Sequence, residues 1–256
     1  MYNTNCKTKF QSFQQNYRRD LELAHYKELK ESAILDSIIN LNYFSADGYL
    51  AEQLYMRNWE GHRNNAGVSA AISRKTDHIS KGCWYCKVAN GNAILKPDFP
   101  RDSLKGKPIK YESGIQCQSS LIILKYSYEA IELVAKRYGI KEYPKGNFKK
   151  ECVEAWEWIN SQTNIPISIT EGAKKRGCMV SKGYAVVGTA GVYVYNDNSE
   201  EEKLKKASRR KLIPEFYQFS GKNFRDLAKR VNRITTISTK QASHLDRISE
   251  TWEVWV

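Results

Sequence analysis

The 256-residue chain has no long apolar run and lacks several motifs that mark common classes of protein. No stretch approaches the roughly 20 apolar residues that a helix needs to span a bilayer. The first eight residues, Met-Tyr-Asn-Thr-Asn-Cys-Lys-Thr, lack the apolar centre of a secretory signal. We therefore expect a cytoplasmic protein with no membrane contact, in which the six cysteines are reduced.

Two kinds of catalytic or binding motif are also missing. Ser220-Gly221-Lys222 has no upstream glycine of the kind that a phosphate-binding P-loop requires. The four histidines show no triad-like grouping along the chain, and no nucleophile-elbow motif accompanies them. These absences argue against a P-loop NTPase and against a serine hydrolase.

What the chain has in excess is positive charge. It carries 41 Lys and Arg against 28 Asp and Glu, a formal net charge of +13. Such an excess attracts polyanions, so single-stranded DNA or nucleotides are the favoured partners. The other interpretation, a basic protein with no polyanionic partner, stays open.

Apolar periodicity predicts a mixture of helices and strands. Residues 21–40 indicate one or two amphipathic helices, and Asn90-Gly91-Asn92 indicates the turn of a hairpin over 84–95. A short strand is expected over 120–124. Helices are expected over 128–138, ended by Gly139, and over 148–160.

The most informative stretch begins with the β-branched run Ile165–Thr170, which is typical of a strand. Glu171 and Gly172 form a turn, Ala173–Ser181 suits a helix, and Tyr184–Val187 supplies the next strand. Two strands around one helix predict a βαβ unit with a ligand site at the carboxyl ends of its strands. Glu171 would lie at that edge.

Two interpretations of Glu171 remain open. Its carboxylate could simply favour the positive end of the following helix. Alternatively, it could bind a divalent cation or act in acid–base chemistry, since Mg²⁺ takes one or two protein carboxylates and keeps several waters.

The stretch Ile165–Val192 resembles the first half of a Toprim fold, the metal-binding domain of primases and topoisomerases. In bacterial-type primases a strand ends in Glu-Gly, and a second strand runs into Leu-Gly-Thr. Here the corresponding residues are Glu171-Gly172 and Val187-Gly188-Thr189. Those primases also carry an upstream basic segment with Lys-Pro-Lys-Tyr, which Lys107-Pro108-Ile109-Lys110-Tyr111 resembles.

A closer resemblance, over roughly 25–219, is to the primase-like domain of unknown function 3854, found in cyanobacterial, plasmid and phage replication proteins. The resembling segments are His25–Ile34, Leu41–Phe44, Lys81–Trp84, Lys96–Arg101, Lys107–Glu112, Ile169–Lys175 and Leu212–Glu215. The resemblance implies a role in replication of mobile DNA beside a helicase. It also implies that Glu171 binds Mg²⁺ or Mn²⁺, that Arg101, Lys107, Lys110 and Tyr111 hold nucleic acid or nucleotide, and that Lys174 and Lys175 line the site.

The chain departs from the family after Glu215. There the family presents an apolar strand that ends in Asp-x-Asp, whereas this chain continues Gly221-Lys-Asn-Phe-Arg-Asp226 and contains no Asp-x-Asp. We therefore expect no such strand, an incomplete metal site and a truncated member of the family. Whether the chain is an enzyme stays open.

Two further patterns allow a structural and a functional interpretation. The basic segment around Lys105, Lys107 and Lys110 is either a solvated loop or a phosphate-binding surface on which Tyr111 stacks a base. Cys83-Trp-Tyr-Cys86 has the spacing of half a zinc knuckle, but no second half follows, so zinc is not expected.

The sequence thus predicts an α/β protein with a Toprim-like parallel sheet flanked by helices. Its expected parts are a flexible arm (1–20), a helical and extended basic part (21–145), a Toprim-like part (146–220) and a divergent tail (221–256). The expected function is that of a primase-like replication module, with a non-catalytic nucleic-acid-binding remnant or a helicase-docking domain as the alternative.

Overall fold

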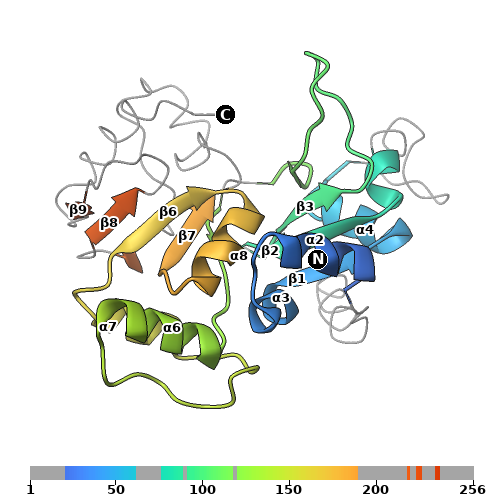
Figure 1. The fold of residues 1–256 in the computed structure, drawn as a ribbon. Helices are drawn as coiled ribbons and strands as arrows, with labels where there is room; N and C mark the ends of the chain where they lie inside the picture. Colours follow the sequence, from blue (N-terminus) through green and yellow to red (C-terminus); the bar gives the residue numbers. More distant parts are fainter. Residues whose placement is uncertain are drawn as a thin grey trace, which may run out of the picture.

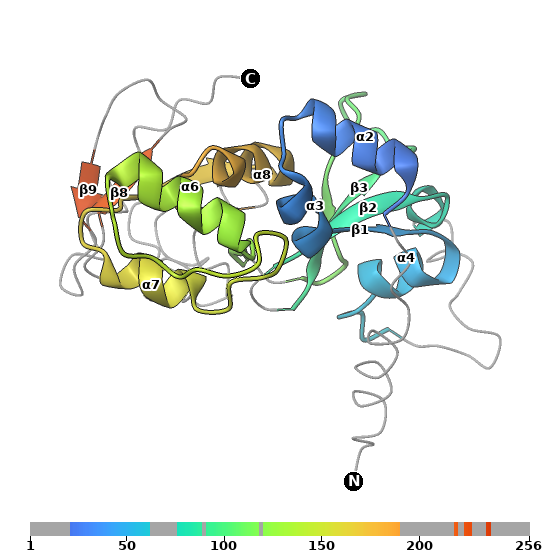
Figure 2. The ribbon, with the colours of Figure 1, turned by 60° about the horizontal axis from the view of Figure 1, so that its bottom comes forward.

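The computed structural model describes residues 21–61, 76–88, 91–117, 120–189, 218–219, 223–226 and 234–236. The predicted arm over 1–20 lies outside these residues, and so does most of 203–233, a stretch with eleven Lys or Arg. The described chain builds two sheets, a four-stranded one in the N-terminal part and a five-stranded one in the C-terminal part, with helix α8 between them in both views (Figures 1 and 2).

The N-terminal sheet is antiparallel throughout and has the order β1-β2-β3-β4. Its strands are β1 (Tyr43–Ala46), β2 (Cys83–Lys87), β3 (Ala93–Pro97) and β4 (Glu112–Ser113). The pairing of β2 with β3, in which Trp84 lies opposite Lys96, confirms the predicted hairpin. The rest of this sheet was not predicted, because β1 and β4 are short and pair with strands distant in the chain.

Helices cover both faces of this sheet (Figure 2). Helices α2 (Leu23–Glu31) and α3 (Asp36–Asn42), which confirm the helices expected over 21–40, bury residues on one face together with Trp84 and Cys86. Helix α4 (Gly48–Tyr55) packs on the other face, where Cys83 and Leu95 are buried. Alternate residues of a strand point to opposite faces, so β2 contributes to two separate cores.

The C-terminal sheet has the order β5-β7-β6-β8-β9. Its strands are β5 (Ile122–Ile123), β6 (Ile167–Glu171), β7 (Val186–Thr189), β8 (Asn223–Asp226) and β9 (Ile234–Thr236). Strands β6 and β7 are parallel and are joined by α8 (Ala173–Ser181), which confirms the predicted βαβ unit.

The expected fold class is therefore right in its coarse form and needs a correction in its detail. The protein mixes helices and sheets, but only the three central strands of the second sheet, β7-β6-β8, run parallel. The edge strands β5 and β9 are antiparallel, and the first sheet has no parallel pair among its described strands. An all-parallel sheet is therefore not a correct description, because the N-terminal sheet pairs its strands antiparallel and joins β2 to β3 by a short hairpin.

The chain contains no apolar strand ending in Asp-x-Asp, but a short polar strand takes a place in the sheet after Glu215. Strand β8 pairs in parallel with β6, with Asp226 opposite Ile169. The sequence Asn-Phe-Arg-Asp is too short and too polar to be recognised as a strand without its neighbour. Its pairing with the central strand of the sheet stabilises it there.

Two further helices complete the C-terminal part. Helix α6 (Tyr128–Tyr138) has the predicted bounds, since the Ser127 side chain caps its first turn and Gly139, at φ +67°, ends it. Helix α7 (Ala155–Ser161) is much shorter than the predicted 148–160. Cys152 donates its backbone N–H to Tyr126 O, and Glu151 forms a bridge with Ser127, so the chain before Ala155 is not helical.

Candidate functional site

The structure places Glu171 where the sequence predicted it, as the last residue of β6. Gly172 follows at φ +77°, a conformation that favours glycine, and α8 begins at the next residue. The Glu171 side chain is 38% exposed, and its Oε1 lies 3.4 Å from Nζ of Lys175, one helical turn later. The two residues predicted for the site therefore form an exposed ion pair at the carboxyl edge of the sheet.

The described side chains around Glu171 do not form a metal site. No group of three or more His, Cys, Asp or Glu that could hold a metal ion occurs in the described part of the chain. Proteins hold Mg²⁺ with one or two carboxylates and several waters, and here the Glu171 carboxylate is paired with the ammonium group of Lys175. The backbone of Asp226 reaches the same edge, because β8 is parallel to β6 and Asp226 pairs with Ile169, two residues before Glu171.

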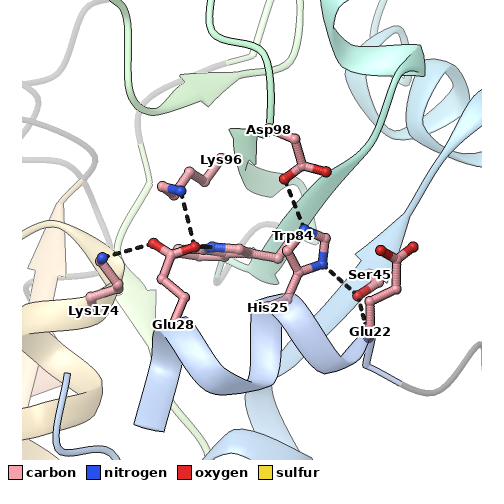
Figure 3. Close-up of polar contacts among 8 residues, drawn as sticks. All are labelled: Glu22, His25, Glu28, Ser45, Trp84, Lys96, Asp98 and Lys174. Carbon is pink, nitrogen blue, oxygen red and sulfur yellow. Dashed lines mark hydrogen bonds and ion pairs between the residues drawn. The ribbon is translucent and has the colours of Figure 1, made fainter. Parts of the chain in front are cut away.

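A group of polar contacts lies nearby, where α2, β2, β3 and α8 meet (Figure 3). Glu28 of α2 accepts hydrogen bonds from Lys174 Nζ at 2.7 Å, from Lys96 Nζ at 3.0 Å and from Trp84 Nε1 at 3.1 Å. We call these four residues the Glu28 cluster. Lys174 is a predicted site residue, whereas the other three were not predicted to have a role.

The Glu28 cluster is partly buried and carries a net positive charge. The side chains of Lys96, Lys174 and Glu28 are between 24% and 30% exposed, so two ammonium groups share one carboxylate. Burial alone would raise the pKa of Glu28, but the hydrogen bonds from Lys174, Lys96 and Trp84 outweigh it and lower that pKa. Glu28 is therefore ionised, and one positive charge of the cluster is uncompensated within it.

Tyr111, another predicted site residue, lies beside this cluster. Its ring packs edge-on against Trp84 with the ring centroids 5.8 Å apart. Burial, together with the charge of Glu28, raises the pKa of Tyr111 to about 12, so its hydroxyl stays protonated. The structure thus brings Lys174 and Tyr111, which are 63 positions apart in sequence, to one place.

A second polar group extends from α2 in the same view (Figure 3). His25 lies between Ser45 and Asp98, with Nδ1 2.7 Å from Ser45 Oγ and Nε2 2.8 Å from Asp98 Oδ1. The histidines show no triad-like grouping along the chain, but the fold brings His25 together with a serine and an aspartate that are distant in sequence. Ser45 is only 3% exposed and its Oγ also accepts the Glu22 N–H at 2.8 Å, so it is placed to tie α2 to β1 and not to attack a substrate.

Arg101 is engaged in an internal ion pair. Its guanidinium donates to both oxygens of Glu112 at 2.9–3.1 Å, and Glu112 is 5% exposed. Glu112 also accepts hydrogen bonds from Tyr55 and pairs with His78. About half of the Arg101 side chain is exposed, so the outer part of the guanidinium faces solvent.

Lys107 and Lys110 lie on a hairpin that follows β3 directly and projects from the N-terminal sheet (Figure 1). Asp102 bridges Pro108, and Ile109 N donates to Arg101 O at 2.9 Å, so backbone contacts join the two arms of this segment. We call residues 101–110 the basic hairpin. Lys105, Lys107 and Lys110 are exposed, and so is Leu104 at the tip.

The Cys-x-x-Cys pair does not have the geometry of a zinc chelate. Cys83 and Cys86 lie three positions apart on β2 and belong to the two cores on opposite faces of the sheet. Burial raises the pKa of the Cys83 thiol to about 12 and that of Cys86 to about 11, so both stay protonated. Protonated thiols facing opposite ways cannot bind one ion.

The predicted site residues therefore fall into three places rather than one. Lys174 and Tyr111 lie at the Glu28 cluster, Glu171 and Lys175 form a pair at the sheet edge, and the rest lie on or at the base of the basic hairpin. The sequence did contain a signal for the residues that were missed. The segments that carry the family resemblance contain the five residues that were missed: His25, Glu28, Trp84, Lys96 and Asp98. They also contain Lys174, which was predicted.

Among the helices of the described residues, none has the length and apolar character needed to cross a membrane.

Comparisons with known proteins agree with part of the resemblance. Residues 155–227, from α7 to just beyond β8, match the family described as Domain of unknown function (DUF3854). An uncharacterized protein of the cyanobacterium Picosynechococcus sp. is 30% identical over 233 residues, which cover 85% of this chain and 22% of that protein. The chain thus spans about a fifth of this relative's length. No solved structure matches the chain.

Proposed function

We propose that the chain is a primase-like DNA-replication module of a mobile element, which binds single-stranded DNA or nucleotides through the Glu28 cluster and the basic hairpin. Its Toprim-like part would be the strands β7-β6-β8 with α8. The observation that carries the proposal is the convergence of Lys96 and Lys174, from the two parts of the chain, on one carboxylate. Two lysines beside one glutamate leave a positive charge next to an aromatic pair, a combination that suits a phosphate and a base.

The basic hairpin extends this positive surface. It starts four residues after Pro97, the end of β3, and presents Lys105, Lys107 and Lys110 to solvent. Lysines on a projecting turn can follow a flexible phosphate backbone without fixed geometry. The exposed Leu104, next to Lys105, adds an apolar surface against which a base can pack.

Salt-dependent binding of a labelled single-stranded oligonucleotide tests the proposal. Each phosphate contact in a single strand contributes about 0.7 to the slope of log K against log salt, so replacing Lys105, Lys107 and Lys110 by alanine should lower the slope by about 2. The matched control replaces Lys141, Lys149 and Lys150, three exposed lysines between α6 and α7, at the opposite end of the molecule in Figure 1. Equal losses in both variants, or no binding of the wild type at low salt, would contradict the proposal.

The catalytic form of the proposal concerns Glu171. Catalysis would require bound Mg²⁺ or Mn²⁺. A single carboxylate that is paired with Lys175 would hold such an ion poorly. Asp226 is the acidic residue whose backbone the strand pairing brings to the same edge. Primer synthesis with Mg²⁺ or Mn²⁺ should fall at least about 100-fold in Glu171→Gln, since phosphoryl transfer depends on neutralising charge at the phosphate.

The alternative is a remnant that binds nucleic acid without catalysis or docks on a replicative helicase. It is favoured by the absence of Asp-x-Asp from the chain. It predicts DNA binding that weakens with salt but is the same with and without Mg²⁺ and in Glu171→Gln. Wild-type primer synthesis that Glu171→Gln abolishes would reject the remnant, and equal activity in both proteins would remove Glu171 from the mechanism.

A further inference from the structure

Arg176 of α8 is buried in an unusual way. The residue is 0% exposed, and its Nε, Nη1 and Nη2 have no hydrogen-bond partner among the described residues. The ionisable groups that influence it are the neutral side chains of Cys86, Tyr43, Tyr126 and Tyr111, and burial lowers its pKa. A guanidinium stays charged even so, and a buried charge without a counter-charge is strongly unfavourable.

Two of these tyrosine hydroxyls donate their protons to backbone carbonyl groups. Tyr43 Oη donates to Ala173 O at 2.8 Å, and Tyr126 Oη donates to Tyr184 O at 2.9 Å. Neither hydroxyl accepts a hydrogen bond from Arg176, and a neutral hydroxyl supplies no counter-charge. The counter-charge must come from something other than these side chains.

The backbone beneath the guanidinium is shaped to accommodate it. Gly188 of β7 packs against Arg176 so closely that a Cβ there would collide with the guanidinium and with Thr170 O. Thr170 pairs with Gly188, and Ser168 pairs with Val186, so all four residues point to the face on which Arg176 lies. Ser168 Oγ is likewise buried without a hydrogen-bond partner among the described residues.

We propose that Arg176 and Ser168 form a subsite for the terminal phosphate of a nucleotide, at the junction of the two sheets beneath the Glu28 cluster. A phosphate offers several acceptor oxygens to a planar guanidinium and a further one to a hydroxyl. The enclosed position suits a group at the end of a small molecule and not a continuous DNA backbone. The inference rests on the proposed function only in naming a nucleotide as the ligand.

Tyr111 marks the side from which such a group would enter. It is only partly buried, and its ring packs edge-on against Trp84 of the Glu28 cluster. Lys96 and Lys174 would hold the remaining phosphates of the same nucleotide, those between the terminal phosphate and the sugar.

Thermal unfolding of the full chain in inorganic phosphate, compared with sodium chloride at equal ionic strength, tests the subsite. The wild type should gain a saturable rise in Tm from phosphate, and Arg176→Met should not respond. Lys136→Met on α6, which also removes one positive charge, should respond as the wild type does, because Lys136 pairs only with Glu132 within its own helix among the described contacts. A wild type indifferent to phosphate, or a full response in Arg176→Met, would overturn the proposal.

A charge-conserving variant shows whether a lost response in Arg176→Met reflects lost binding or lost folding. Arg176→Lys keeps the charge but loses the paired N–H groups, so its phosphate affinity should be about tenfold lower or worse, whereas equal affinity would overturn the proposal. Different results would reject the subsite and the proposed function. A phosphate response that depends on Arg176 without DNA binding would reject the replication role, and DNA binding without that response would reject the subsite.

Discussion

Glu28 accepts hydrogen bonds from side chains of three different elements, so its ionisation depends on the folded state. In the unfolded chain its pKa returns to the ordinary value near 4.5. In the folded protein the donors Lys174, Lys96 and Trp84 overcome burial and keep the pKa below that value. A carboxylate whose pKa is lower in the folded state stabilises the fold above its unfolded pKa, and this contribution is lost as the pH falls through the folded pKa.

Glu28→Gln should therefore lower the free energy of unfolding by about 1–2 kcal/mol above pH 5, because it weakens hydrogen bonds to two ammonium groups. The difference from the wild type should shrink steadily as the pH falls below about 4. Urea unfolding at a series of pH values measures it. Glu157→Gln, on the exposed side of α7, is the control and should show neither effect; a Glu28 effect that is constant with pH would contradict the assignment.

At the scale of elements, local signals predicted the structure where caps or turns decide it. The helix over 128–138 was predicted with its correct bounds because Ser127 and Gly139 cap it through their own local geometry. Ala173–Ser181 was predicted equally well, between the turn at Gly172 and Gly183 at φ +76°. In these segments the local sequence is sufficient to predict where the helix begins and ends.

Elements that depend on distant partners were not predictable in the same way. The apolar stripe from Phe148 to Ile159 suggested one helix, but Cys152 pairs with Tyr126, and Phe148 is exposed. The Glu28 cluster shows the same limit, because Glu28 and Lys174 are separated by 146 positions. Periodicity carries no information about contacts of that kind, although both residues lie in segments that carry the family resemblance.

Gly177 of α8 provides a test of how closely the elements of the two parts pack. A Cβ at this position would collide with Tyr43 Oη of β1 and lie 2.8 Å from the Ile34 Cδ1 atom. Helix propensity alone predicts that Gly177→Ala stabilises the protein by about 1 kcal/mol. We expect the opposite sign, a loss of about 1–3 kcal/mol, because overpacking dominates.

The double variant Tyr43→Phe, Gly177→Ala identifies the colliding atom. Removing the hydroxyl should recover most of the loss caused by the alanine, so the two effects measured by urea unfolding should not add. Additive losses would show that Tyr43 is not the obstacle. Stabilisation by Gly177→Ala alone would show that α8 does not approach β1 as closely as described.

At the scale of the whole molecule, the two sheets share one core. The same cluster of buried residues contains Trp84 and Cys86 from the antiparallel sheet, Val186 from the mixed sheet, and Ile131 from α6. It therefore runs across the boundary near residue 145 that the sequence suggested between an N-terminal and a Toprim-like part. Removing either part would expose the apolar surface of the other.

The shared core predicts that both sheets unfold in a single cooperative transition. Hydrogen exchange should give the same free energy of opening for the most protected amides of β2 and of β6, with the same dependence on denaturant. Ile131→Ala, at a fully buried position, should lower that free energy by about 2–5 kcal/mol in both sheets although Ile131 lies on α6. Val153→Ala, at a residue that is 84% exposed, should change neither. If Ile131→Ala weakened protection of β6 alone and left β2 unchanged, the two sheets would be independent units and the junction that holds Arg176 would not be a rigid part of the fold.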